Sequence, residues 1–166
     1  SCIYFYDDIM DMRGKSFDFN HVAEFLVDNM DKLDFKPQPN TTAALHYHTG
    51  REQGDAEARS AKLLLSKLPG VNLIDIGTDP KFGRHCTPAV IDQMEPGGWE
   101  DMSRSFVEKA VEMGADTYST LYHGCQRNMC RYEADYPGKV EHYLTLVGRA
   151  LGIEPEDTHK KHTQIG

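Results

Sequence analysis

Histidine, cysteine and tyrosine gather in three short segments of this sequence. The segments are His46-Tyr47-His48, His85-Cys86 and Tyr122-His123-Gly124-Cys125. Thiolate sulfur and imidazole nitrogen are donors that zinc and iron accept, and mixed sets of three or four suit a zinc or a mononuclear iron ion. A tyrosine phenolate can also ligate ferric iron. The residue types therefore favour a metal site, if the fold brings the segments together.

Predicted strands alternate with predicted helices along the chain. Strands are expected at 41–47, 71–76 and 117–122, where short runs of apolar and β-branched residues end at turn-forming residues. Helices are expected from an Asn20 cap to Leu33, from a Gly54-Asp55 cap to Leu68, over 99–113 with Gly114 behind it, over 126–135 and over 140–151. This alternation predicts an α/β fold, a single domain with a small parallel sheet covered by helices.

In such a fold the carboxyl ends of the strands meet at one edge of the sheet, where ligands bind. The first strand ends at Tyr47, the loop after the second carries His85 and Cys86, and the third ends at Tyr122 shortly before Cys125. We therefore expect these five residues to converge on one edge.

The end of the first strand cannot direct all of its side chains to one ion. Successive side chains of a strand point to opposite faces of the sheet. His46 and His48 are therefore expected to share a face, with Tyr47 on the other.

Length and charge exclude several classes of function. The chain has 166 residues, enough for one ordinary domain, and a formal net charge of -8. That charge argues against nucleic-acid binding, which needs a basic patch.

No apolar run reaches the roughly 18 residues of a membrane span, so no transmembrane segment is expected. Four irregularly spaced cysteines and no signal segment at the start predict a cytoplasmic protein with reduced thiols. The first residue, Ser1, is not Met, which suggests a processed chain or a fragment of a longer protein.

The intervals between the three segments point to a family. There are 37 residues between Tyr47 and His85, and 35 between Cys86 and Tyr122. This spacing resembles the cysteine-rich CCG domain of heterodisulfide reductases and related iron–sulfur oxidoreductases, in which a cysteine, a Cys-Cys pair and a C-x-x-C motif follow one another. The run His48-Thr49-Gly50-Arg51, with Leu68-Pro69-Gly70-Val71 and Leu151-Gly152-Ile153, also fits the family, and the resemblance covers about residues 20 to 162.

Three of the five family cysteines are replaced in this chain. Cys86 and Cys125 remain, whereas Tyr47, His85 and Tyr122 stand at the other positions. The resemblance implies a noncubane iron–sulfur cluster, held by five thiolates, at which disulfides are split. Two thiolates and one histidine would need further ligands to hold any smaller cluster. An iron–sulfur cluster, a zinc ion, a mononuclear iron ion and no cofactor therefore stay open.

The family positions and the metal-binding residue types beside them predict roles for single residues. The expected metal ligands are Cys86, Cys125, His85 and His123, and the expected lining of the site is Tyr47, Tyr122, His46, His48 and Arg51. Arg51 would stabilise the site or bind an anionic ligand. Cys130 matches no family position and is expected to be structural or incidental.

Three parts of the chain are expected: an N-terminal segment 1–36 with an amphipathic helix, a CCG-like α/β domain 37–154, and a charged tail 155–166. Cys2 precedes the helix that begins near Asn20 by nearly the distance from Cys125 to the helix containing Val140. One interpretation of this faint repeat is that residues 1–36 end a preceding copy of the same unit.

Three functions remain as hypotheses. The first is an oxidoreductase domain or subunit that transfers electrons, or performs thiol/disulfide chemistry, at a metal centre with altered ligation. It implies other subunits of a redox complex as partners. The second is a cluster-less scaffold that assembles such a complex. The third is a zinc or mononuclear iron site of Cys86, Cys125 and nearby histidines. The first ranks highest, because the family resemblance covers most of the chain.

Overall fold

Four parallel strands form the centre of the molecule. The computed structural model describes residues 20–48, 52–76 and 94–153. The strands are β1 (Thr41–His46), β2 (Val71–Ile74), β3 (Thr117–Thr120) and β4 (Lys139–His142), in the order β2-β1-β3-β4. In the register, Ala43 lies opposite Leu73 on one side and Thr117 on the other. The predicted small parallel sheet of an α/β fold is confirmed.

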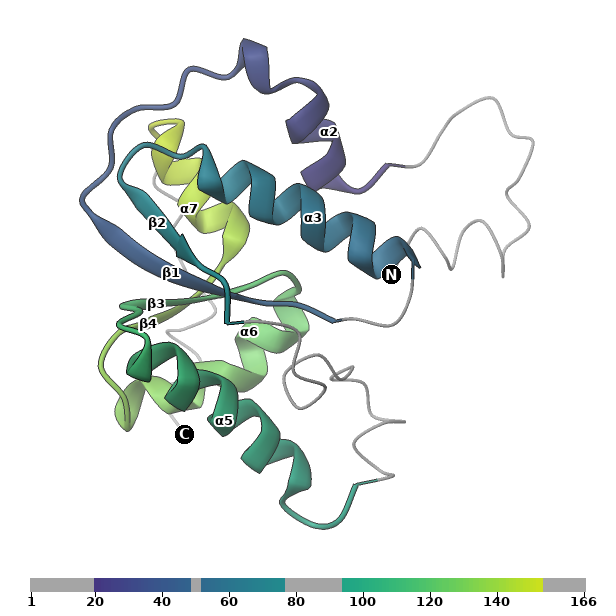
Figure 1. Cartoon of the computed structure of the whole chain (residues 1–166), viewed down its shortest axis with the longest axis vertical. Helices are drawn as coiled ribbons and strands as arrows, with labels where there is room; N and C mark the ends of the chain where they lie inside the picture. The colour runs from purple at the N-terminus through teal and green to yellow at the C-terminus, as the bar shows by residue number, and fades with distance from the viewer. Residues whose placement is uncertain (1–19, 49–51, 77–93, 154–166) are drawn as a thin grey trace.

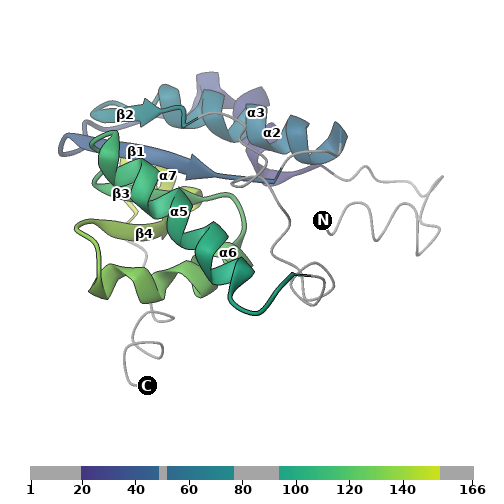
Figure 2. The ribbon, with the colours of Figure 1, turned by 60° about the horizontal axis from the view of Figure 1, so that its bottom comes forward.

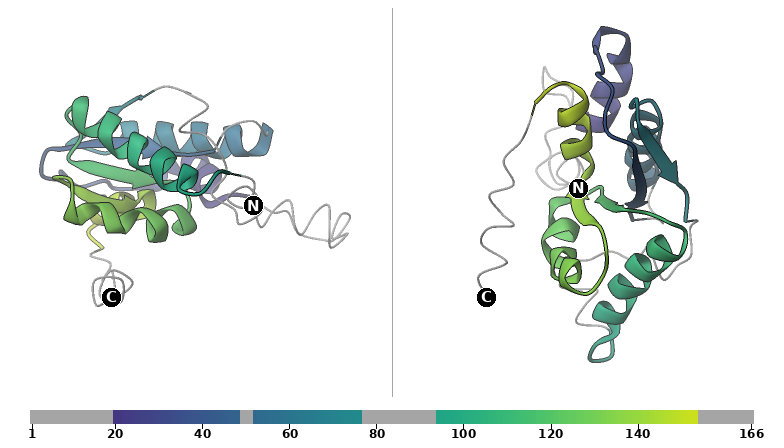
Figure 3. Two further views of the ribbon diagram at one scale, coloured as in Figure 1. Left: turned by 90° about the horizontal axis from the view of Figure 1, so that it is seen from below. Right: turned by 90° about the vertical axis from the view of Figure 1, so that its left-hand side faces the viewer.

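Helices cover both faces of this sheet. α2 (Val22–Asp28), α3 (Glu52–Ser66) and α7 (Tyr143–Ala150) lie on one face, and α5 (Gly98–Glu112) and α6 (His123–Met129) lie on the other (Figures 1 and 3). Two short 3-10 helices, η2 (Met30–Lys32) and η3 (Cys130–Ala134), follow α2 and α6. We refer to the two faces as the α3 layer and the α5 layer.

Strand β1 contributes to the core on both faces, as expected for a parallel strand covered twice. Leu45 packs in the α3 layer, whereas Ala44 packs in the α5 layer. The apolar stripe predicted for the second helix is buried in the α3 layer: Ala58, Ala61, Leu64, Leu65 and Leu68. Ala23 of α2 belongs to the same cluster, and α2 packs along α3 (Figure 2).

The prediction of one helix over 140–151 was wrong. Lys139–His142 is the fourth strand, and α7 begins only at Tyr143. The strand is short and is covered on both faces, so Val140, Glu141 and His142 are all buried and show no alternation. Without a period of two, the segment resembles the first turn of the apolar helix that follows it.

Several predicted boundaries also moved. The helix near residue 20 is capped by His21 rather than Asn20, and its α-helical part ends at Asp28 rather than at Leu33. His21 accepts from the Ala23 N–H while Glu24 bonds back to the His21 N–H, which is a capping box. The second helix begins at Glu52, so Gly54-Asp55 is not its cap.

The ends of three strands and the course of the polar helix also differ from the prediction. β1, β2 and β3 stop one or two residues earlier than expected, because the pairing ends before the apolar pattern does. The helix predicted over 126–135 is divided into α6 and η3. Gly114 follows the α5 C-cap Met113 as predicted, with a positive φ of 85°. No helix in the part of the chain described is long and apolar enough to cross a membrane.

Candidate metal centre

The last residue of β1 and the two residues after it send their side chains to different layers. His46 is 2% exposed, and its ring lies 5.0 Å from that of Phe106, which belongs to α5. His48 follows two residues later, and its ring centroid lies 5.5 Å from that of His46. Tyr47, between them, packs in the α3 layer. The predicted alternation is therefore confirmed, and the two histidines lie on the α5 side.

Cys125 reaches the same place from the helix that follows β3. It lies in the first turn of α6 and is 2% exposed. Its Sγ is 3.3 Å from His48 Nε2. One donor atom from each of His46, His48 and Cys125 lies within 4.8 Å of the other two. Three buried donors from two separate segments therefore converge.

The strand order explains this location. From β1 the chain passes to β2 on one side, and β3 then returns to the other side of β1. The carboxyl ends of β1 and β3 thus flank the point where the winding reverses, where ligands of doubly wound folds bind. The Leu121 N–H donates to the His46 carbonyl at 2.9 Å and joins the two strand exits.

The donor set fits a single metal ion. Zinc bonds of roughly 2.0 Å to nitrogen and 2.3 Å to sulfur in a tetrahedral site put the two donors about 3.5 Å apart. The 3.3 Å between His48 Nε2 and Cys125 Sγ is close to that separation. Three protein ligands leave a further coordination position, which is the arrangement of reactive rather than purely structural sites.

Tyr122 packs against this group without directing its hydroxyl to it. Its ring stacks on that of His48 at a centroid distance of 4.9 Å. Its hydroxyl donates to Glu57 Oε2 at 2.6 Å. Burial, followed by the bond to Glu57, raises the pKa of Tyr122 far above its ordinary value of about 10. Tyr122 is therefore a neutral phenol here, and its ring packs against His48.

Glu57, from α3, is a residue that the sequence reasoning missed. Its side chain is fully buried, and its Oε1 has no hydrogen-bond partner among the described residues. His21 Nε2 lies 3.9 Å from Oε2. Burial, and then the nearby carboxylate of Glu57, raise the pKa of the Tyr143 phenol above its ordinary range. A signal was present, because Glu57 lies four residues before Ala61 on the apolar stripe of its helix.

Tyr47 has a different environment on the opposite face. The ammonium of Lys62 donates to its hydroxyl at 2.8 Å and also lies 3.3 Å from Asp75. Burial lowers the pKa of Lys62, but the bonds to Tyr47 and Asp75 outweigh it, so that the pKa rises above its ordinary value. Tyr47 is therefore a core residue that closes the α3 side of the strand end.

His123 lies apart from the three clustered donors. It is exposed, and its ring stacks on that of His142 at 3.8 Å and an interplanar angle of 10°. Cys130 is buried in the α5 layer, where it packs in the core. Arg51, His85 and Cys86 lie outside the described residues, so their predicted roles stay predictions.

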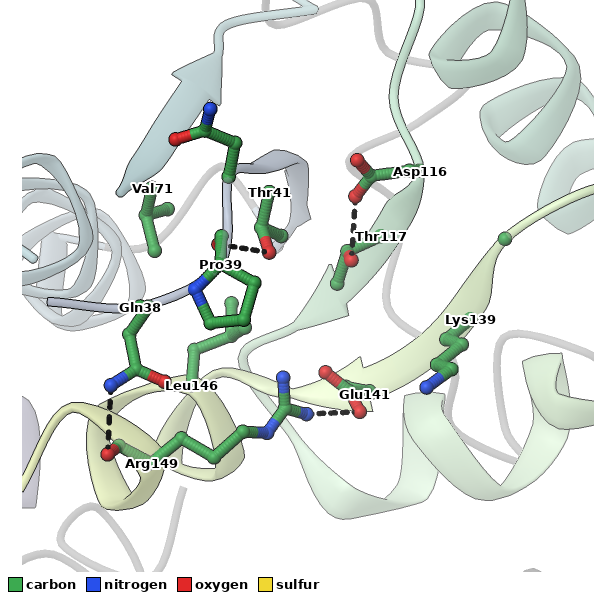
Figure 4. A pocket seen from close by; sticks show the side chains of 12 residues that line it. Gln38, Pro39, Thr41, Val71, Asp116, Thr117, Lys139, Glu141, Leu146 and Arg149 are labelled. Atoms are coloured by element: carbon green, nitrogen blue, oxygen red, sulfur yellow. Dashed lines mark hydrogen bonds and ion pairs between the residues drawn. The ribbon is translucent and has the colours of Figure 1, made fainter. Parts of the chain in front are cut away.

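A pocket of about 420 Å³ opens at the opposite, amino-terminal edge of the sheet (Figure 4). It is lined by the strand starts Thr41, Val71, Thr117 and Lys139, among others. Within it the guanidinium of Arg149 donates to the Glu141 carboxylate. No sequence motif indicates this pocket, because its residues come from separate segments.

Sequence comparison relates the chain to one kind of redox protein. No family model matches it. The D subunit of the dihydromethanophenazine:CoB–CoM heterodisulfide reductase of Methanosarcina mazei is 32% identical over 149 residues, covering 83% of this chain and 35% of the relative. Its counterpart in Methanosarcina barkeri is 30% identical over 151 residues, covering 86% and 36%. That of Methanosarcina acetivorans is 29% identical over 149 residues, covering 84% and 36%.

The chain spans about a third of the length of these relatives. Across most of its own length it is homologous to a part of the heterodisulfide reductase D subunit.

Proposed function

We propose that this chain is a redox domain of the heterodisulfide reductase type, and that it works at a single metal ion held by His46, His48 and Cys125. The observation that carries the proposal is the convergence of three buried donors within 4.8 Å where the winding of the sheet reverses. The homology to the reductase D subunit supports redox function as the class, since those relatives are named as subunits of a reductase.

The donor set favours one ion over a cluster. Iron–sulfur clusters are held chiefly by cysteine thiolates, and Cys125 is the single thiol of the described group. Two imidazoles and a thiolate suit iron or zinc. We favour iron for electron transfer or thiol/disulfide chemistry, because zinc does not change its oxidation state. Cys86 and His85 are further candidate ligands, and with them a small cluster is the competing cofactor.

The chain's own residues bury and orient the centre. Phe106 contacts His46 and Tyr122 stacks on His48, so that aromatic rings flank both imidazoles. Rings at these positions exclude water and hold each imidazole in one orientation. A dry surrounding also strengthens the interaction between an ion and its ligands.

We further propose that the domain works with other subunits or domains of a redox complex in the cytoplasm. The relatives are named as one subunit of a reductase, and this chain spans about a third of them. Cysteine thiols stay reduced in the cytoplasm, and the described cysteines Cys125 and Cys130 are thiols, which supports the proposed location.

Elemental analysis tests the proposal. The chain is purified without oxygen and then reconstituted with iron(II) or zinc. We expect it to bind one ion and no acid-labile sulfide. His48→Ala and Cys125→Ser should each lose the ion. His123→Ala and Cys130→Ser are the matched controls, because they change the same residue types outside the group. A folded wild-type chain without metal would overturn the proposal, and sulfide in proportion to iron would replace the single ion by a cluster.

A scaffold without any cofactor is the second candidate. It is favoured by Tyr47 and Tyr122, which stand at family cysteine positions and are packed against core residues. This function predicts that replacing Cys86 and Cys125 together by Ser leaves the activity of an intact complex unchanged. A large loss of activity in a complex that still assembles would exclude it.

A further inference from the structure

We propose that Glu57 is a positioning and charge-balancing residue of the metal centre, acting through Tyr122 on the ligand His48. The inference rests on the proposed function, because it concerns the same centre. No sequence motif assigns Glu57 a role.

The burial of Glu57 calls for an explanation. A carboxylate without contact to water is costly unless it is paired and hydrogen-bonded. Glu57 is 0% exposed, yet one of its two oxygens has no hydrogen-bond partner in the part of the chain that the structure describes. It occupies an apolar stripe in which a leucine or alanine would pack without this cost. A residue that is costly for folding at such a position indicates a role beyond packing.

A continuous chain of contacts leads from Glu57 to the thiol ligand. Glu57 Oε2 accepts from the Tyr122 hydroxyl at 2.6 Å, and the Tyr122 ring stacks on His48 at 4.9 Å. His48 Nε2 lies 3.3 Å from Cys125 Sγ. Tyr122 packs against both core clusters, so it connects the α3 layer with the α5 layer beyond the end of the sheet. A single tyrosine therefore separates the carboxylate from the first ligand.

The negative charge of Glu57 and the positive charge of the metal centre are complementary. A divalent ion with one thiolate and two neutral imidazoles carries a net charge of +1, and such a charge in a buried site needs compensation. Around Glu57, the described neighbours are the neutral phenols of Tyr122 and Tyr143 and the imidazole of His21. Among described residues no lysine or arginine forms an ion pair with Glu57. The metal centre would therefore supply a positive charge beside Glu57 in addition to that of His21 when its imidazole is protonated.

The same contacts restrain geometry. The bond to Glu57 fixes the plane of the Tyr122 ring, and that ring fixes the plane of the His48 imidazole. Groups that orient a ligating histidine typically change metal affinity by roughly 10- to 100-fold when removed. We therefore expect Glu57 to act on affinity and on ligand geometry together.

Cobalt(II) binding tests this inference without any assay of activity. The dissociation constant is measured by competition with a chromophoric chelator, and the thiolate-to-cobalt and d–d absorption bands report the ligand geometry. We expect Glu57→Gln, which keeps an acceptor for Tyr122 but removes the charge, to weaken binding by roughly tenfold or more. Tyr122→Phe, which keeps the ring but breaks the bond, should shift the bands as well.

Two further variants separate this role from a structural one. Glu57→Asp keeps the charge and should restore part of the affinity. Glu141→Gln is the matched control, because Glu141 is also a buried carboxylate but pairs with Arg149 at the far edge of the sheet. It should bind cobalt as the wild type does. If Glu57→Gln does not fold, Tyr122→Phe and Glu57→Asp still decide the question.

The outcomes distinguish the two proposals. A wild-type chain that binds no metal defeats the proposed function. A wild-type chain that binds cobalt, together with folded Glu57→Gln and Tyr122→Phe variants of unchanged affinity and spectrum, overturns the role of Glu57 alone.

Discussion

His142 is surrounded so that its imidazole stays neutral. Its Nδ1 accepts from the Leu144 N–H at 3.3 Å, so the proton is on Nε2, which donates to the Leu121 carbonyl at 3.0 Å. Burial, and next the charge of His123, lower its pKa from 6.5 to about 4, although the bond to Leu121 acts in the opposite direction. The residue caps α7 and packs against Tyr143.

This lowered pKa predicts a loss of stability in acid. Because the folded pKa lies below the unfolded one, the contribution is complete above about pH 6.5 and declines as the pH falls toward 4, by up to about 3 kcal/mol. Urea unfolding at pH 7.5, 6, 5 and 4 measures it. His142→Asn keeps a capping side chain but does not titrate, so its stability should fall less over this range. Equal pH dependence of both proteins would contradict the prediction.

Single residues of the site were predictable to different degrees. His46 and His48 were expected to line the site and Cys125 to bind a metal, and the structure brings the three side chains together. Their grouping without Tyr47 or His123 depends on distances that spacing does not supply. Glu57 escaped because sequence patterns sort residues by polarity, and a buried acid is rare enough to be taken for a solvent-facing one.

At the scale of elements, the turn into β4 depends on Gly138. Its φ is 114°, and a Cβ atom at this position would lie 2.6 Å from the Asp116 carbonyl oxygen and 2.9 Å from the Tyr118 hydroxyl. The Asp116 carbonyl accepts from the Lys139 N–H at 3.0 Å and begins the pairing of β3 with β4. The backbone must therefore approach closely here, which glycine alone allows.

Gly138→Ala should cost about 2 kcal/mol or more in the free energy of unfolding, because it combines a left-handed backbone with a clash. Gly114→Ala is the control for the backbone alone. Gly114 has a φ of 85°, but a Cβ there would meet nothing within 4 Å. Its substitution should cost about 1 kcal/mol. Chemical denaturation of both variants measures the difference in the free energy of unfolding. Equal losses of stability would show that the close approach at Gly138 adds nothing to the cost.

The elements were predictable where independent sequence signals agreed. α5 was found nearly to the residue, because its apolar stripe and the glycine behind it agree. The prediction failed for 140–151, because α7 follows β4 without a loop between them. His142 is both the last residue of β4 and the N-cap of α7. A buried strand and a buried helix turn have the same composition, and only the pairing with β3 separates them.

At the scale of the molecule, the metal centre would connect β1 to α6. An ion that binds the folded chain but not the unfolded chain stabilises the fold. The gain in the free energy of unfolding is roughly 2.7 kcal/mol when the free ion concentration is one hundred times the dissociation constant. We therefore expect zinc(II) or cobalt(II) to raise the melting temperature relative to a chelator-treated sample in calorimetry. The His48→Ala variant should show no such rise. A rise of equal size in wild type and variant would mean that the ion binds elsewhere.

The α/β class was predictable because alternating strands and helices admit few arrangements. The division at residue 36 stays a prediction. Ala23 lies in the core together with α3 and α7, so part of the expected N-terminal segment packs with the domain that follows it.

The alternation of β1 has a consequence for how such a site can change over time. An insertion of one residue before His46 would exchange the two faces, turning both histidines toward Lys62 and Tyr47 toward Cys125, whereas an insertion of two would restore them. Insertions of an odd number of residues would therefore move these side chains to the wrong faces, whereas insertions of an even number would keep them on the same faces. Position 47, where the family resemblance predicts a cysteine, belongs to the α3 layer in this chain, and 46 and 48 belong to the α5 layer. On that prediction, the proposed donors His46 and His48 are a second set on the other face, rather than a replacement for the cysteine.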